Sequence, residues 1–197
     1  MNLNDLEEKD FKKYLIDHLN KINSGWVDGD KSSNLEKTVD LLNQSLKIAI
    51  EIKDDTTYKH EFPPITGEII VGGLDLNNKS EQLKSDAKDA NKKFRNYPNF
   101  KTILLIRTEL INIPYDVIGY IFGGLKRFAK KDKDLIEIGR KNKFLSFTST
   151  KEVGSYLLFG NGKYYYVENP NANLYRVIAE DDIEKYFSEK IHKIQIQ

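Results

Sequence analysis

Residues 37–55, KTVDLLNQSLKIAIEIKDD, contain two apolar runs separated by a polar turn at residues 43–45. In the second run, every other residue is an isoleucine: Ile48, Ile50 and Ile52. Alternation with a period of two is typical of a β-strand. We therefore expect the isoleucines on one face of the strand, and Glu51 and Lys53 on the other. The segment predicts an antiparallel hairpin around which the rest of the chain is arranged.

The position of the turn sets which residues of the hairpin meet. A turn centred between Gln44 and Ser45 would place Asp40 opposite Ala49 and diagonal to Glu51. Diagonal neighbours on antiparallel strands lie roughly 7–8 Å apart. Both carboxylates could then reach one cation.

The two faces of this hairpin are expected to differ in polarity. Val39 and Leu41 would join the isoleucines on the apolar face, while Asp40 would lie with Glu51 and Lys53 on the opposite face. Carboxylates and a strand carbonyl are the hard oxygen ligands that Mg²⁺ prefers. An adjacent ammonium can orient a water molecule and hold a phosphate. The alternative is a surface hairpin of a structural protein, with a solvated charged face.

Asp40, ten intervening residues and then Glu51-Ile52-Lys53 on an apolar strand form a pattern that resembles the PD-(D/E)XK nuclease superfamily. The resemblance covers roughly residues 1–108, although Val39 stands where the motif has proline. It implies an α/β fold with a restriction-endonuclease-like αβββαβ core and a mixed sheet. It also implies a metal-dependent endonuclease that hydrolyses phosphodiester bonds, with DNA as the expected substrate.

The same resemblance assigns roles to individual residues. Asp40, Glu51 and the Ile52 carbonyl would hold Mg²⁺, for which Mn²⁺ can substitute, and Lys53 would orient or activate the attacking water. Glu8 is an additional candidate, because the first helix of some members supplies a glutamate; a first-turn glutamate also simply favours the helix dipole. Gln82 is another, because some branches place a glutamine on the second helix.

The segments around the hairpin agree with this core. Apolar residues at helical spacing predict helices over residues 5–23 and 80–96, with Lys93 on the exposed side of the second. A near-continuous apolar run predicts a central strand over residues 101–108, buried on both faces. A helix between two strands is typical of the right-handed crossover that joins parallel strands.

The second half of the chain predicts a further helix and a β-rich extension. The helix is expected over residues 113–130, and another over residues 180–191 closes the chain. Strands are expected over residues 143–148, 155–159, 163–168 and 174–178. At least one of the three tyrosines at positions 164–166 should be exposed. We expect a nuclease-like core over residues 1–130, with an insertion at 55–79, and an extension over 131–197 packed on it as one compact unit.

A basic stretch at residues 126–143 is the candidate surface for the phosphate backbone. Its nucleic-acid-binding candidates are Lys126, Arg127, Lys130 and Lys131. A solvated lysine-rich surface explains the stretch equally well. Because the net charge of the chain is only +1, a nucleic-acid partner would need such a local basic surface.

Composition excludes several classes of protein. The chain has no cysteine, so it has no disulfide and no thiolate metal site. Its three isolated histidines give no zinc spacing. No stretch approaches the roughly 20 apolar residues of a membrane span, and the charged N-terminus is not typical of a secretory signal. We expect a cytoplasmic protein with no membrane partner, and the choice between monomer and homodimer stays open.

Two alternatives to a nuclease remain at this point. One is a catalytically inactive module that binds nucleic acid or protein on the same fold, and the other is a small structural or interaction protein with a charged hairpin. The insertion that follows the second run could cover the substrate, and Asp54, Asp55 and His60 could add ligands or a general base. Polar loop residues in solvent explain those three side chains as well.

Overall fold

The computed structural model describes residues 3, 6–32, 37–55, 76–108, 127–131, 134–138, 150–160, 163–187 and 191–193. The helices are α1 (Glu8–Ile22), α2 (Gly29–Ser32), α3 (Leu76–Phe94) and α5 (Glu180–Phe187), with a 3-10 helix η4 (Leu174–Arg176). The strands are β1 (Trp26–Asp28), β2 (Leu41–Asn43), β3 (Ile48–Asp55), β4 (Lys101–Thr108), β5 (Arg127–Lys131), β6 (Asp134–Ile138), β7 (Ser155–Gly160), β8 (Lys163–Glu168) and β9 (Ile191–Lys193). The fold is mixed α/β.

Seven strands form one mixed sheet in the order β1-β2-β3-β4-β7-β8-β9. β1, β2 and β3 are an antiparallel meander. β3, β4 and β7 run parallel, β8 returns antiparallel and β9 is parallel to β8. The helix α3 connects β3 to β4, as expected for a crossover between parallel neighbours. The strands after residue 150 therefore continue the sheet that the first half of the chain begins.

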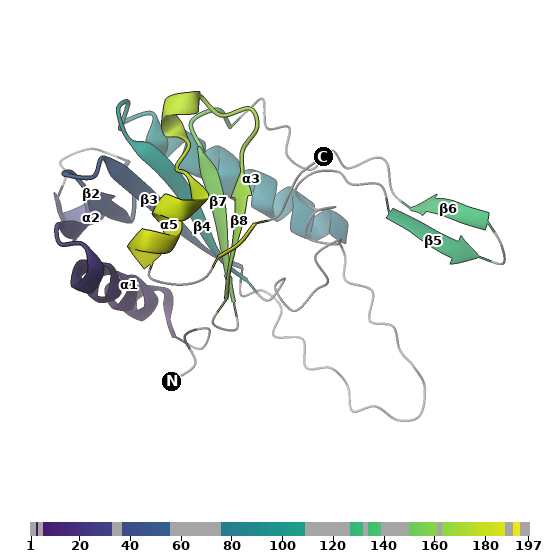
Figure 1. Ribbon diagram of the computed structural model, residues 1–197, viewed down its shortest axis with the longest axis horizontal. Coiled ribbons are helices and arrows are strands. Elements are labelled where there is room, and N and C mark those ends of the chain that lie inside the picture. The colour runs from purple at the N-terminus through teal and green to yellow at the C-terminus, as the bar shows by residue number, and fades with distance from the viewer. Residues whose placement is uncertain are drawn as a thin grey trace.

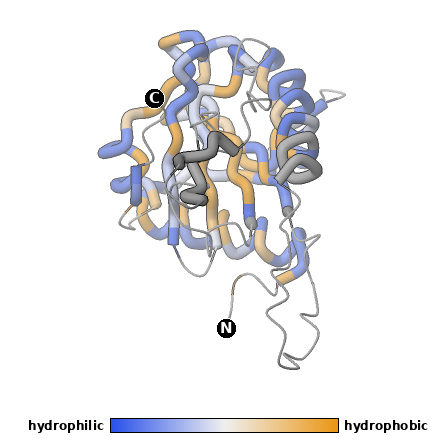
Figure 2. The backbone as a smooth tube through the Cα atoms, turned by 90° about the vertical axis from the view of Figure 1, so that its right-hand side faces the viewer, coloured by the Kyte–Doolittle hydropathy of each residue, from blue (hydrophilic) through white to orange (hydrophobic). Residues whose placement is uncertain are grey.

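Helices cover both faces of this sheet (Figure 1). On one face, α1 and α5 bury Phe11, Leu15 and Phe187 against the isoleucines of β3. On the other face, α3 buries its apolar stripe, which consists of Leu83, Ala87, Ala90 and Phe94. Figure 2 shows the apolar strands inside and the more polar helices outside. The prediction of helices facing an apolar sheet is confirmed.

Strand β4 spans residues 101–108 as predicted, and Ile103, Leu104, Leu105 and Ile106 are all buried. β4 lies between two parallel neighbours under helices on both faces, so neither face needs polar side chains. The predicted strands at residues 155–159 and 163–168 correspond to β7 and β8. The second predicted helix begins four residues earlier than expected, at Leu76.

Three predictions for the second half are wrong. Residues 127–130 belong to strand β5, which pairs with β6, so the helix predicted over 113–130 does not reach its predicted end. η4 replaces the strand predicted at 174–178. The last helix ends at Phe187, and Ile191 begins β9. For η4 and β9, contacts or pairing with residues far away in sequence override the local pattern, whereas β5 pairs with the adjacent strand β6. The predicted boundary between residues 130 and 131 falls inside β5, and the strand predicted at 143–148 lies outside the described residues.

The tyrosines of β8 are also more buried than expected. Tyr164, Tyr165 and Tyr166 are each at most 5% exposed, so the prediction that one of them faces solvent is wrong. Tyr164 and Tyr166 pack on the α5 side of the sheet, and Tyr165 packs on the α3 side. Both faces of β8 are therefore covered by the two hydrophobic clusters that pack on the sheet. None of the helices in the described ranges combines the length and the apolar character needed to cross a membrane.

Candidate active site

The hairpin of β2 and β3 is present, but its register differs from the prediction. Leu42, not Asp40, lies opposite Ala49. The ladder is therefore displaced by two residues. Continued along the chain, the same register brings Asp40 level with Glu51 instead of diagonal to it. The two acids are thus closer in register than the sequence indicated.

The longer turn explains this displacement. Residues 44–47 form the turn, instead of the three residues expected. The side chain of Asn43 accepts a hydrogen bond from the Leu46 amide at 3.0 Å, and Lys47 adopts a left-handed conformation with φ of 54°. Asparagine is typical of such side-chain-closed turns, whereas a left-handed lysine is uncommon.

Val39 does not join the apolar face that was predicted for it. It packs with Leu42 and Ala49 on the α3 side, whereas Leu41 packs on the α1 side. The alternation of faces is therefore broken just before β2. The backbone there is held by α2, because the Gly29 amide donates to the Asp40 carbonyl at 2.9 Å. This contact lets the Asp40 side chain point towards Lys12 of α1, whereas Glu51 and Lys53 contact residues of α3. The prediction that all three side chains share one face of the hairpin is therefore not confirmed for Asp40.

The Asp40 carboxylate is held on both of its oxygens. Oδ2 accepts a hydrogen bond from the backbone amide of Ile52 at 2.8 Å, and Oδ1 lies 3.3 Å from the ammonium of Lys12. Ile52 lies between Glu51 and Lys53 in sequence. The contact therefore fixes Asp40 directly beside the two other residues of the predicted triad.

Lys12 of α1 contacts three aspartates that come from separate parts of the chain. Its ammonium lies 2.8 Å from both Asp28 and Asp30, in addition to its contact with Asp40. Thr38 donates a further hydrogen bond to Asp30. Burial alone would lower the pKa of Lys12, but its hydrogen bonds to Asp28 and Asp30 and the charges of Asp40 and Asp30 raise it well above its usual value.

Glu51 is the buried centre of the site, with a side chain only 1% exposed. Its Oε1 lies 2.6 Å from the ammonium of Lys93 and 3.1 Å from that of Lys53. Its Oε2 is buried and has no hydrogen-bond partner among the described residues. Burial, and then the negative charge of Asp40, raise the pKa of Glu51 to about 7 although both lysines oppose them.

Lys53 projects to the same side of the sheet as Glu51, as predicted. Its ammonium lies between Glu51 and Asp89 of α3, which is 3.2 Å away. Burial lowers its pKa, but the charge of Glu51 and the hydrogen bonds to Glu51 and Asp89 outweigh burial, so that the pKa lies above its usual value. The side chain is 24% exposed, so the ammonium can meet a ligand from solvent.

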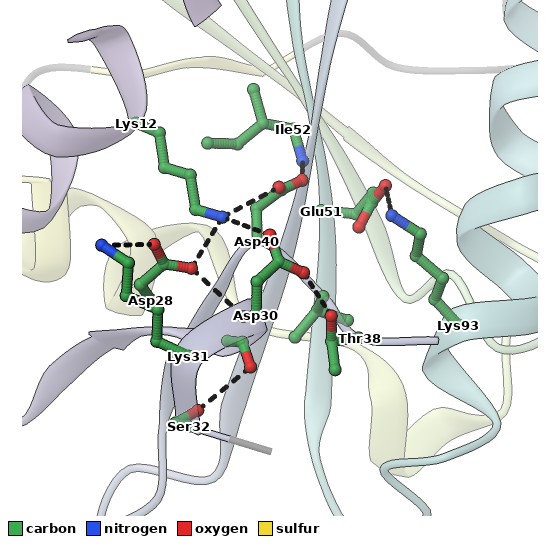
Figure 3. Close-up of polar contacts among 12 residues, drawn as sticks. Lys12, Asp28, Asp30, Lys31, Ser32, Thr38, Asp40, Glu51, Ile52 and Lys93 are labelled. Atoms are coloured by element: carbon green, nitrogen blue, oxygen red, sulfur yellow. Dashed lines mark hydrogen bonds and ion pairs between the residues drawn. The ribbon is translucent and has the colours of Figure 1, made fainter. Parts of the chain in front are cut away.

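Two lysines bracket the acid pair. Figure 3 shows Lys12 approaching Asp40 from one side and Lys93 approaching Glu51 from the other. Four lysines of the described residues face five carboxylates across this region. They are Lys12, Lys31, Lys53 and Lys93 against Asp28, Asp30, Asp40, Glu51 and Asp89. When all of them are ionised, the cluster keeps an excess of negative charge that favours a further cation.

The donor set suits a magnesium ion held by few protein ligands. One observation tests whether the site fits a cation. Glu51 Oε2 is buried and accepts no hydrogen bond from the described residues, and the charge of the Asp40 carboxylate acts on Glu51. No group of three or more His, Cys, Asp or Glu arranged to hold a metal occurs within the described ranges. Mg²⁺ commonly binds through one or two carboxylates and keeps several waters, so Asp40 and Glu51 are the two candidate ligands among the described residues.

The two additional candidates lie on the helices α1 and α3. Glu8 is exposed in the first turn of α1, and the α1 residue that reaches the site is Lys12, one turn later. Gln82 lies on α3, seven residues before Asp89, which corresponds to about 10 Å along a helix. Its Cα therefore lies about two helical turns from Asp89, and its role stays a prediction.

The remaining candidates are the polar residues at and after the end of β3 and the residues of the basic stretch, and the structure describes only some of them. Asp54 is not an extra ligand, because the guanidinium of Arg107 binds both of its oxygens. His60 and Lys126 lie outside the described residues, and the side chain of Asp55 is not described. The other three basic candidates, Arg127, Lys130 and Lys131, lie on β5 rather than on a helix.

Sequence reasoning missed the lysines that bracket the acids. Lys93 was expected to be exposed, yet its side chain is 23% exposed and is paired with Glu51. A usable signal was present, because Lys12 follows the buried Phe11 and Lys93 precedes the buried Phe94. Positions next to an apolar helical stripe border the sheet, where a long side chain can reach an acid on the strands.

The site therefore offers two carboxylates, an unpaired oxygen and two partly exposed ammoniums, which together suit a metal ion and a phosphate ester. The acids lie deep, and the lysines lie nearer to solvent. No family model, curated protein or solved structure matches this chain.

Proposed function

We propose that this chain is a metal-dependent nuclease that hydrolyses phosphodiester bonds, with DNA as its expected substrate. One observation carries the proposal: a buried Glu51 oxygen without a partner, next to Asp40 and on the same side of the sheet as Lys53. Leaving a buried carboxylate oxygen unpaired is costly. A cation that binds there would remove that cost.

The order of the elements supports the proposal. α1, the β1-β2-β3 meander, α3 and β4 follow one another in the order of the restriction-endonuclease-like core that the sequence resembles. The acids also occupy the corresponding places, with Asp40 just before β2 and Glu51 and Lys53 on β3. We infer the finer fold from this agreement of order and position.

Each residue has a role in this proposal. Asp40, Glu51 and the Ile52 carbonyl would hold Mg²⁺ or Mn²⁺. When bound, such an ion supplies an activated water and stabilises negative charge on the phosphate. Lys53, held between Glu51 and Asp89, would orient the attacking water and bind a phosphate oxygen.

The test is cleavage of DNA and RNA with and without divalent cations. Asp40→Ala, Glu51→Ala and Lys53→Ala should each reduce Mg²⁺-dependent cleavage by roughly a hundredfold or more. Asp17→Ala and Lys88→Ala are matched controls, because both residues are exposed on helices away from the cluster. Full activity in a folded triple variant of Asp40, Glu51 and Lys53 would disprove the proposal.

The second candidate function is an inactive binding module on the same fold. It is favoured by the pairing of Asp40 with Lys12 and of Glu51 with Lys93, which can stabilise the fold without a metal. This candidate predicts binding of nucleic acid that weakens steeply with salt, with no cleavage in Mg²⁺ or Mn²⁺. The same cleavage assay, accompanied by a gel-shift titration, separates the two functions.

A further inference from the structure

The two oxygens of the Glu51 carboxylate have different surroundings. Oε1 lies within 3.1 Å of both lysine ammoniums, whereas Oε2 has no partner among the described residues. Two ammoniums on one oxygen repel each other. One side of the carboxylate is thus crowded with positive charge, and the other side is open to a cation.

The two ammoniums differ in how firmly they are held. Lys53 also contacts Asp89, so it keeps a partner if its contact with Glu51 weakens. For Lys93, Glu51 is the one hydrogen-bonding partner in the described part of the chain. An ammonium has three donors, so Lys93 has two left, on a side chain that is 23% exposed. Lys93 is therefore the ammonium that can change partners.

Lys12 does not share this freedom. It contacts three carboxylates, which occupy all of its donors, and its side chain is 13% exposed. Removing its contact with Asp40 would still leave it paired with Asp28 and Asp30. Of the two lysines that bracket the acids, Lys93 has a single hydrogen-bonding partner in the described part of the chain and the more exposed side chain. The charges of Asp30 and Asp89 also attract its ammonium, without a hydrogen bond.

We propose that Lys93 is an exchangeable counter-ion of Glu51 and a second phosphate-binding residue of the site, beside Lys53. Without a metal, its ammonium neutralises Glu51. When a divalent cation takes over the Glu51 charge, the attraction between Glu51 and Lys93 falls and the cation repels the ammonium. Lys93 then binds an oxygen of a nucleic-acid phosphate, for which an ammonium is a well-suited donor. This inference rests on the proposed function.

The first experiment measures the affinity of the full chain for Mn²⁺ by calorimetry, without nucleic acid. Lys93→Met removes the competing ammonium, so Mn²⁺ should bind roughly tenfold more tightly. Lys92→Met is the matched control, because Lys92 is the neighbouring exposed lysine on α3 and its loss should change the affinity less than about twofold. Lys93→Arg keeps the charge and should stay close to wild type. Equal affinities in all four chains would overturn the inference.

The second experiment measures binding of a DNA duplex in saturating Mn²⁺ by fluorescence anisotropy. It is done in a Lys53→Ala background, so that the duplex stays intact. Adding Lys93→Met should weaken binding by roughly fivefold and reduce the salt slope by about one. Adding Lys92→Met should change binding less than adding Lys93→Met. The same affinity and slope with and without Lys93 would overturn the inference.

These results separate the inference from the nuclease proposal. If the wild-type chain binds no Mn²⁺, both fail. If it binds Mn²⁺ and cuts DNA, but Lys93→Met changes neither affinity, only the inference about Lys93 fails. If both affinities change as expected in a chain that does not cut DNA, the inference holds and the nuclease proposal fails.

Discussion

The Asp40 carboxylate accepts a hydrogen bond from the backbone amide of Ile52 at 2.8 Å. That amide joins the two residues that carry the other predicted catalytic groups, Glu51 and Lys53. The hydrogen bond therefore ties all three side chains to one short segment of strand β3. Any movement of β3 relative to the segment before β2 would change the position of Asp40 together with theirs.

Asp40→Asn should separate the charge of Asp40 from its structural contact. The asparagine oxygen can still accept from Ile52, so the free energy of unfolding should fall by no more than about 1 kcal/mol. Asp40→Ala loses both the charge and the hydrogen bond to Ile52, so its free energy of unfolding should fall by about 1–3 kcal/mol. Both variants should lose most of their Mn²⁺ affinity. Urea unfolding measures the change in stability, and calorimetry measures the change in affinity. An Asp40→Asn variant that binds Mn²⁺ like wild type would contradict the assignment.

Glu51 should make the metal-free protein less stable as the pH rises. Burial and the charge of Asp40 raise its pKa from 4.5 to about 7, so the folded chain binds this proton more tightly than the unfolded chain does. The unfolding free energy should therefore fall between about pH 4.5 and 7, by about 3 kcal/mol in total. The lowered pKa values of Asp30 and Asp89 act at lower pH, below their usual value of 3.8.

Glu51→Gln should remove most of this dependence and gain stability above pH 7. The measurement is urea unfolding in a chelator from pH 5 to 8.5, with Asp17→Asn as the control for a lost exposed carboxylate. A wild-type chain whose stability is flat or rises over this range would contradict the prediction.

Gly29→Ala should destabilise the fold and weaken the site. A Cβ at Gly29 would lie 2.0 Å from the Val39 carbonyl oxygen, and the Gly29 amide is bonded to the Asp40 carbonyl. The backbone would have to shift, which should cost about 2–3 kcal/mol and displace Asp40. Thermal unfolding and Mn²⁺ titration test this. The control is Lys31→Ala, at an exposed lysine of α2 whose ion pair is with Asp28. It should change the melting temperature and the Mn²⁺ affinity far less.

Arg176 should be among the most sensitive residues outside the site. Its buried guanidinium binds Glu152 and donates to the carbonyls of Phe94, Tyr97 and Phe100. Arg176→Met should lower the unfolding free energy by about 3–5 kcal/mol, because it removes the cation that pairs with the Glu152 carboxylate and takes one donor from each of three carbonyls. The double variant with Glu152→Met should be less destabilised than the sum of the single variants. Additive losses in urea unfolding would contradict this coupling.

The strands and helices around the site could be predicted because their patterns are local. The isoleucines of β3 and the apolar run of β4 each fix a strand without reference to distant residues. The register could not be predicted, because it depends on the Asn43 side chain and the left-handed Lys47 in the turn. The two bracketing lysines were missed for a related reason, since their partners lie far away in sequence.

The errors in the second half have the same origin. Residues 174–178 have a strand-like pattern, but Arg176 is held by carbonyls about 80 residues earlier in the sequence, a contact that no local window contains. The tyrosines of β8 could not be placed until the sheet was known to continue to β9 on its far side.

The bonds of Arg176 to the end of α3 also have a consequence for synthesis on the ribosome. The carbonyls of Phe94, Tyr97 and Phe100, at the end of α3 and just after it, gain this donor only once the chain has been translated past residue 176. A nascent chain that stops after β4 would contain Asp40, Glu51 and Lys53 but would lack the group that anchors their supporting helix. Contacts this distant in sequence form late, so we expect the geometry of the candidate site to mature only after Arg176 has been synthesised.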